Sequence, residues 1–129
     1  MDKGVWIAAI VGLIGLPALA QGRVEQGREA FEQYCAVCHG MNAEGEGPLS
    51  PWLIRNPSDL TALTAQNDGT FPTDYVYFVI DGRSEVAAHG PREMPVWGTR
   101  FGLTDPDASA DDTQERILNI IAYLETIQD

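Results

Sequence analysis

Lysine is almost absent from this sequence of 129 residues, because Lys3 is the only one. Eight basic residues stand against nineteen acidic ones, which gives a formal net charge of −11. Nucleic acids and anionic membrane surfaces repel a chain with this charge. The charge therefore indicates either a partner with a basic surface or simple solubility.

Cysteine and histidine are also scarce, with two of each in the chain. A structural zinc site needs four ligands, which would have to be Cys35, Cys38, His39 and His89. The adjacent Cys38 and His39 are poorly placed to share one small tetrahedral ion. A thioredoxin-like redox pair would need a strand before Cys35 and a βαβ context, and neither is visible.

Several other site patterns are missing. The glycine-rich run over residues 40–48 lacks the lysine and the strand-to-helix context of a P-loop, and its glutamates would repel phosphate. The aspartates over residues 105–112 do not match the spacing of an EF-hand. There are no internal repeats, and the length predicts one modest domain.

An apolar run over residues 5–14 is followed by small residues up to Ala20. This arrangement is typical of an export signal, so we predict that residues 1–20 form a signal peptide cleaved after Ala20. The alternative is an uncleaved membrane anchor, because residues 4–20 reach the short limit of a membrane span. Cleavage would leave residues 21–129 as one lysine-free domain with the same net charge.

Residues 24–34 have the periodicity of an amphipathic helix with Gly27 on its apolar face. A glycine inside a helix costs about 1 kcal/mol relative to alanine, so Gly27 predicts the close approach of another helix. Residues 115–127 form the clearest helical pattern, and Asp112 with Glu115 resembles a capping box at its start. We expect these two helices to cross at Gly27.

A third helix is predicted over residues 74–80, with Thr73 as its N-cap and Gly82 just after its end. The aromatic and β-branched residues of this run also favour a strand, but no partner strand is visible. Residues 83–104 are predicted to be a loop, because glycines and prolines such as Gly98 interrupt them.

Both cysteines belong to one stretch, Cys35-Ala36-Val37-Cys38-His39. Two thiols three positions apart, followed by an imidazole, fit covalent haem attachment, in which each thiol adds across one vinyl group. His39 would then lie beneath the iron and bind it through a neutral imidazole nitrogen. One such motif predicts one haem c, attached through Cys35 and Cys38.

The candidates for the second iron ligand are Met41, His89 and Met94. Met41 lies two residues after His39, too near in sequence to reach the opposite haem face easily. His89 and Met94 lie in one irregular segment, and Pro95 favours an extended backbone at Met94 that stiffens its presentation. We predict Met94 as the second ligand, with His89 as the alternative.

Other residues are candidates for contacts with the haem. Trp52, Trp97 and Phe101 could line the pocket, and ordinary core packing explains each of them equally well. Arginine forms strong charge-assisted hydrogen bonds with carboxylates such as a haem propionate. The candidates for that pairing are Arg55, Arg83 and Arg92.

With these motifs, the sequence resembles the small bacterial class I c-type cytochromes that carry one haem. The matching residues are Gly27 and Phe31, Cys35 to Gly40, Gly45-Glu46-Gly47-Pro48, Met94-Pro95, and Tyr123-Leu124. The resemblance implies an all-α cytochrome c fold, with terminal helices that cross nearly at right angles and an exposed haem edge. It also implies His39 and Met94 as axial ligands, and the carbonyl of Pro48 as acceptor for the other ring proton of His39.

These features predict a periplasmic electron-transfer protein with His/Met ligation, and not an enzyme. A six-coordinate iron leaves no position for a substrate. Its partners would be redox proteins with a basic docking patch, unlike those of the mitochondrial-type members, which dock through lysines. One alternative is a haem subunit of a dehydrogenase or sulfur-oxidising complex. Another is a peroxidase-like or sensor-like haem protein with a labile distal ligand, for which His89 is the available acid–base residue.

Overall fold

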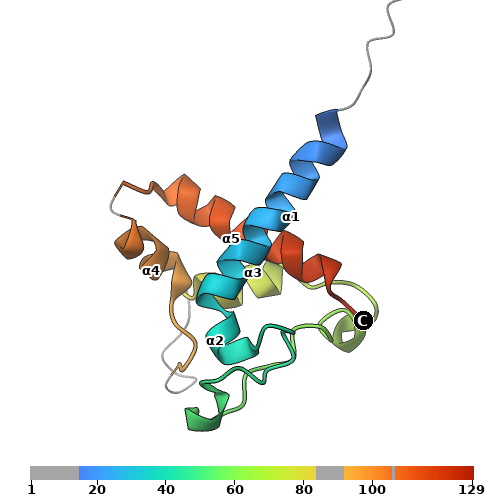
Figure 1. The fold of residues 1–129 in the computed structure, drawn as a ribbon, viewed down its shortest axis with the longest axis vertical. Coiled ribbons are helices and arrows are strands. Elements are labelled where there is room, and N and C mark those ends of the chain that lie inside the picture. Colours follow the sequence, from blue (N-terminus) through green and yellow to red (C-terminus); the bar gives the residue numbers. More distant parts are fainter. Residues whose placement is uncertain (1–14, 84–91, 106) are drawn as a thin grey trace, which may run out of the picture.

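The computed structural model describes residues 15–83, 92–105 and 107–129, and these residues form helices and loops without any strand (Figure 1). The predicted all-α fold is therefore confirmed. No helix among the described residues is both long and apolar enough to cross a membrane. The elements are α1 (Gly15–Tyr34), α2 (Ala36–His39), two 3-10 helices, η1 (Ser50–Trp52) and η2 (Ala65–Asn67), α3 (Thr73–Asp81), α4 (Trp97–Thr104) and α5 (Ala110–Thr126).

The two longest helices, α1 and α5, cross at Gly27 as predicted (Figure 1). A Cβ atom on Gly27 would lie 1.8 Å from the backbone oxygen of Asn119, so only glycine permits this approach. The Asn119 side chain accepts a hydrogen bond from Arg23 at 3.1 Å and donates one to Gln26 at 2.9 Å. The amide is therefore satisfied within the crossing.

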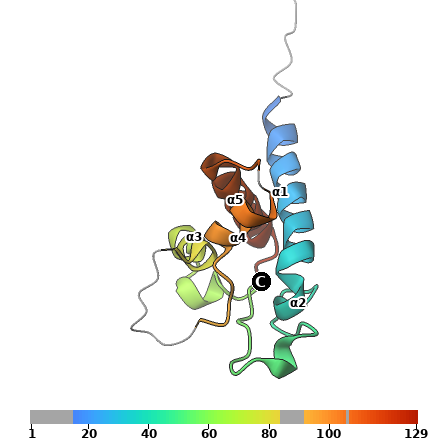
Figure 2. The ribbon, with the colours of Figure 1, turned by 90° about the vertical axis from the view of Figure 1, so that its left-hand side faces the viewer.

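The apolar core lies around this crossing. Helix α5 packs against α1, α3 and α4, so it is the central element of the fold (Figure 2). Phe31 contributes from α1, and its ring centroid lies 5.4 Å from that of Tyr123, with the two ring planes tilted by 49°. The large side chains that are fully buried are Phe31, Phe101, Ile117, Ile120 and Leu124.

Helix α5 begins at Ala110, five residues before the predicted start. The expected pairing of Asp112 with Glu115 is wrong, because Ser109 is the N-cap and forms the capping box with Asp112. The Ser109 hydroxyl accepts from the Asp112 amide at 3.2 Å, and the Asp112 carboxylate accepts from the Ser109 amide at 2.7 Å. These two bonds satisfy amides that have no partner inside the helix.

Helix α3 is a helix and not a strand, and it ends as predicted at Gly82, which has φ 65°. In this left-handed conformation, the Gly82 amide closes the helix on the carbonyl of Phe78. Thr73 is the first residue of α3 and makes no capping bond, so its predicted role is wrong. Its hydroxyl instead donates to the Glu125 carboxylate of α5 at 3.1 Å.

Helix α4 replaces the last part of the predicted loop over residues 83–104. Gly98 lies inside this helix and faces Asp81, since a Cβ there would lie 2.3 Å from the Asp81 carboxylate. Glycine at this position therefore permits close packing between α3 and α4. The burial of Trp97 and Phe101 stabilises α4 by more free energy than a glycine inside the helix costs.

Candidate haem site

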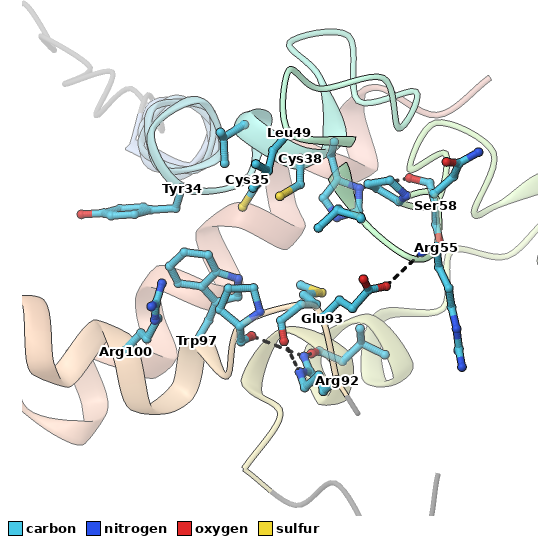
Figure 3. A pocket seen from close by; sticks show the side chains of 18 of the residues that line it. Tyr34, Cys35, Cys38, Leu49, Arg55, Ser58, Arg92, Glu93, Trp97 and Arg100 are labelled. Atoms are coloured by element: carbon cyan, nitrogen blue, oxygen red, sulfur yellow. Dashed lines mark hydrogen bonds between the residues drawn. The ribbon is translucent and has the colours of Figure 1, made fainter. Parts of the chain in front are cut away.

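A cavity of about 560 Å³ opens between two walls (Figure 3). One wall consists of α2 and the segment 49–58, and the other consists of α3 and the segment 92–97. Cofactor pockets typically have volumes of about 300–1,000 Å³ and mostly apolar linings. The apolar lining here includes Val37, Leu49, Leu53, Phe78, Val79, Pro95 and Trp97.

The cysteine motif forms a single helical turn that continues from α1. The amides of Cys38 and His39 donate to the carbonyl of Cys35 at 3.1 and 2.9 Å. Residues three and four positions apart in such a turn share one face, so both sulfur atoms and the imidazole line the same cavity. Figure 3 shows the two sulfur atoms side by side on this wall.

Both cysteines are free thiols. Burial, together with a smaller effect of the neighbouring Cys38, raises the pKa of the Cys35 thiol to about 12. Burial also raises the pKa of Cys38. Before any attachment, the thiols are therefore protonated at neutral pH. The described part of the chain contains no group of three His, Cys, Asp or Glu side chains able to hold a metal ion.

The imidazole of His39 is oriented by a backbone carbonyl. Its Nδ1 lies 3.1 Å from the carbonyl oxygen of Ser58, which can only accept, so Nδ1 carries the proton. The lone pair is then on Nε2, which is free to bind iron. Burial lowers the pKa of His39, and the bond to Ser58 opposes this shift. The sequence offered no side-chain signal for Ser58, because its backbone makes the contact.

The expected acceptor, the carbonyl of Pro48, is not the partner of this imidazole. The residues on either side of Pro48 are bound to the backbone of the motif turn. The Gly47 amide donates to the Cys38 carbonyl at 3.0 Å, and the Leu49 amide donates to the Val37 carbonyl at 2.9 Å. These bonds fix Pro48 beside α2, while the chain returns to the imidazole ten residues later, at Ser58.

The opposite wall carries Met94, which is half-buried and packs against the core. Arg92 fixes its backbone, because Nε of Arg92 donates to the Met94 carbonyl at 2.6 Å. The same guanidinium donates to the carbonyl of Val79 in α3. Arg92 therefore joins the backbone of Met94 to helix α3.

The structure thus brings together all four residues predicted to bind the haem. Met41, the first alternative for the second ligand, is 65% exposed and does not line the cavity. The other alternative, His89, lies outside the described residues. The four residues at the cavity are Cys35, Cys38, His39 and Met94.

Of the aromatic candidates, only Trp97 lines the cavity. Phe101 is buried in the core beside it, with its ring centroid 5.1 Å from that of Trp97. Trp52 is 82% exposed and is not among the residues that line the cavity. Trp97 therefore fits the expectation of a pocket residue and Phe101 fits the alternative of core packing, whereas Trp52 fits neither. The local sequence does not show which face of a segment meets the cavity.

Two of the predicted arginines, Arg55 and Arg92, line the cavity. Arg83 does not, since its Nε donates to the Asp81 carboxylate at 2.8 Å. Sequence reasoning missed Arg100, which lines the cavity and lies 5.9 Å from the centroid of the Trp97 ring. Its position three residues after Trp97 would have indicated this, had α4 been predicted as a helix.

Comparison with known proteins gives one family. Residues 22–124 match the family described as cytochrome c oxidase, cbb3-type, subunit III. No curated protein and no solved structure matches the chain. The matched range includes both walls of the cavity. Two free thiols, an imidazole with one free nitrogen and a thioether fit a covalently bound haem c, the cofactor of this c-type cytochrome domain.

Proposed function

We propose, on the premise that this chain belongs to the family of cytochrome c oxidase, cbb3-type, subunit III, that it is an electron carrier with His39 and Met94 as iron ligands. Haem c, when bound, supplies one-electron chemistry at its iron. The observation that carries the proposal is the convergence of the four predicted residues on one cavity, with His39 oriented by Ser58.

Each residue has a defined task in this proposal. The thiols of Cys35 and Cys38 would form two thioethers and anchor the cofactor to α2. Nε2 of His39 would bind the iron from the α2 wall, and the sulfur of Met94 would bind it from the opposite wall. Because these two side chains would occupy both axial positions of the iron, no position would remain for a substrate, and the site would be suited to electron transfer and not to catalysis.

Substitution of Met94 tests the ligation. The ferric wild-type protein should show the weak far-red charge-transfer band of a sulfur–iron bond. Met94→Ala should abolish this band and open the iron to added imidazole or cyanide.

Mass spectrometry of the denatured wild-type protein should give the polypeptide plus one haem, and Cys38→Ala should lose one thioether and accumulate poorly.

His89→Ala is the matched control, and it should leave the band and the reduction potential nearly unchanged. If His89→Ala alters the ligation while Met94→Ala does not, the assignment of Met94 is wrong. The reading as a peroxidase-like or sensor-like protein would then gain support, because a labile distal side is what such a protein needs.

The proposed partners are redox proteins with a basic docking patch. The support is the net charge of −11, together with Trp52 and Ile54, which are 82% and 88% exposed beside the cavity-lining loop. The association rate with a basic partner should fall steeply as salt is added. Trp52→Ala should weaken the complex and leave the reduction potential unchanged. A rate that does not depend on salt would show that the acidic residues serve solubility.

A second candidate is a haem subunit of an oxidase complex, and the printed description of the family favours it. A free carrier should purify as a monomer, whereas a subunit should co-purify with the rest of its complex.

For either role we propose an exported, periplasmic location, with residues 1–20 as the signal. Mass analysis should find Gln21 at the mature N-terminus, and retention of Met1 in a membrane fraction would indicate an anchor.

A further inference from the structure

The two walls of the cavity are joined by the carboxylate of Glu93. One carboxylate oxygen accepts a hydrogen bond from the Ile54 amide at 2.7 Å, and the other accepts one from the Arg55 amide at 3.1 Å. Figure 3 shows Glu93 reaching from its own wall toward Arg55. The contact spans 38 to 39 residues of sequence, so it arises from the fold and not from a local turn.

Both ends of this contact lie next to proposed iron ligands. Glu93 immediately precedes Met94, and Arg92 on its other side fixes the carbonyl of Met94. At the far end, Arg55 lies three residues before Ser58, which orients the imidazole of His39. Glu93 therefore links the segment that carries one ligand to the segment that orients the other.

The chemistry of the contact makes it stronger than its exposed position suggests. An ionised carboxylate that accepts from backbone amides forms charge-assisted hydrogen bonds, which are about twice as strong as neutral ones. Two consecutive amides, each meeting one oxygen, also fix the direction of the carboxylate. Segment 92–95 can leave the cavity only if this pair of bonds breaks or if the opposite loop moves with it.

We infer that Glu93 is a positioning residue that keeps Met94 at the iron by fastening its segment to the opposite wall. The inference rests on the proposed function, since it assumes that Met94 is the ligand. The rate at which Met94 detaches is then set by the opening of the tether at Glu93. Loss of this tether should make the iron accessible more often without removing Met94 itself.

The test measures how fast imidazole binds the ferric holoprotein, because imidazole can enter only when Met94 has left. Glu93→Gln removes the charge and one of the two acceptors, so we expect the binding rate to rise about tenfold. The far-red band should weaken but remain. Glu29→Gln removes the same charge from the exposed surface of α1 and should bind imidazole at the wild-type rate. Glu93→Asp serves as a second variant if the first accumulates poorly.

A general loss of stability must be separated from a local role. Ser109→Ala weakens the start of α5, outside the residues that line the cavity. If Ser109→Ala, at a similar loss of unfolding free energy, accelerates imidazole binding as much as Glu93→Gln, the inference is overturned. A Glu93→Gln rate within about twofold of the wild type also overturns it.

The failure of the inference is distinguishable from that of the proposed function. If Met94→Ala loses the far-red band while Glu93→Gln binds imidazole normally, only the role of Glu93 is wrong. If Met94→Ala retains the band of the wild type, the ligation is wrong, and the inference falls with it.

Discussion

The crossing of α1 with α5 and the cavity between the two walls are stabilised in different ways. At the crossing, the backbone of Gly27 meets the backbone of Asn119, and Phe31 and Ile117 are fully buried. At the cavity, single polar contacts join loops to helices or to each other. These contacts are His39 to the Ser58 carbonyl, Arg92 to the carbonyls of Val79 and Met94, and Glu93 to the amides of Ile54 and Arg55.

The difference follows from the backbone. Helices satisfy most of their own amides and carbonyls, so a helix crossing depends chiefly on shape and buried apolar area. Loops have backbone groups that still need partners, and side chains such as those of Arg92 and Glu93 provide them. Among the described residues, no buried polar side-chain atom lacks a partner. The crossing should therefore be sensitive to volume, and the cavity walls to the loss of hydrogen-bonding groups.

The largest expected effect is that of Gly27→Ala, which would break the crossing. The added Cβ would meet the Asn119 backbone, which cannot rotate away, so α1 and α5 must separate. We expect a loss of about 3 kcal/mol in the free energy of unfolding, measured by urea denaturation of the holoprotein.

Gly102→Ala in α4 is the control, because a Cβ there meets nothing within 4 Å. It should be neutral or slightly stabilising, since alanine favours a helix more than glycine does. If both substitutions cost the same, close packing is not what Gly27 provides.

Arg92→Lys tests the polar side of the comparison and should have an intermediate effect. The planar guanidinium donates to carbonyls on α3 and on the ligand segment at once, and an ammonium group cannot reproduce that fork. We expect a loss of about 1–3 kcal/mol in thermal or urea denaturation. Arg28→Lys, at the exposed ion pairs with Glu25 and Glu32, should change stability little. If Arg92→Lys and Arg28→Lys reduce stability equally, the two bonds of Arg92 to backbone carbonyls do not stabilise this wall of the cavity.

A smaller effect is expected at the N-terminus of α5, far from the crossing. Ser109→Ala removes the hydroxyl that caps the Asp112 amide and should cost about 1 kcal/mol. Thermal denaturation of the holoprotein measures this loss. If Ser109→Ala lowers the free energy of unfolding as much as Gly27→Ala, the crossing does not stabilise the two helices more than the N-cap does.

The smallest effect is a pH dependence at the same cap. Hydrogen bonds from the Ser109 backbone and hydroxyl lower the pKa of Asp112 in the folded protein. Its contribution is therefore present above the ordinary carboxyl pKa and is lost as the pH falls through the folded value. The difference in melting temperature between wild type and Asp112→Asn should shrink from pH 7 toward pH 3. A constant difference would contradict this account.

The parts of the site that could be predicted are those encoded over a few residues. The turn from Cys35 to His39 places two thiols and an imidazole on one face because of helical spacing alone. Pro95 favoured Met94 as the candidate ligand, and Met94 does line the cavity, whereas Gly27 was indicated by its place on an apolar face. Each of these signals lies within a single segment.

The errors occurred where a residue depends on a distant segment. Gly98 predicts an interruption if it is read alone, but it lies inside α4, where Trp97 and Phe101 are buried and Asp81 leaves no room for a Cβ atom. The carbonyl that orients His39 belongs to Ser58 and not to Pro48, which depends on the path of the loop between them. Trp52 lies outside the lining for the same reason.

The sequence by itself determined the covalent haem motif, a candidate thioether ligand and the two amphipathic helices near the ends of the domain. Only the tertiary structure decided which carbonyl orients the imidazole, which arginines line the cavity, and that Glu93 joins its walls. The physical reason is that helix patterns and motifs arise from spacing along the chain. Contacts across 19 or 39 residues depend instead on where the packed helices place the loops.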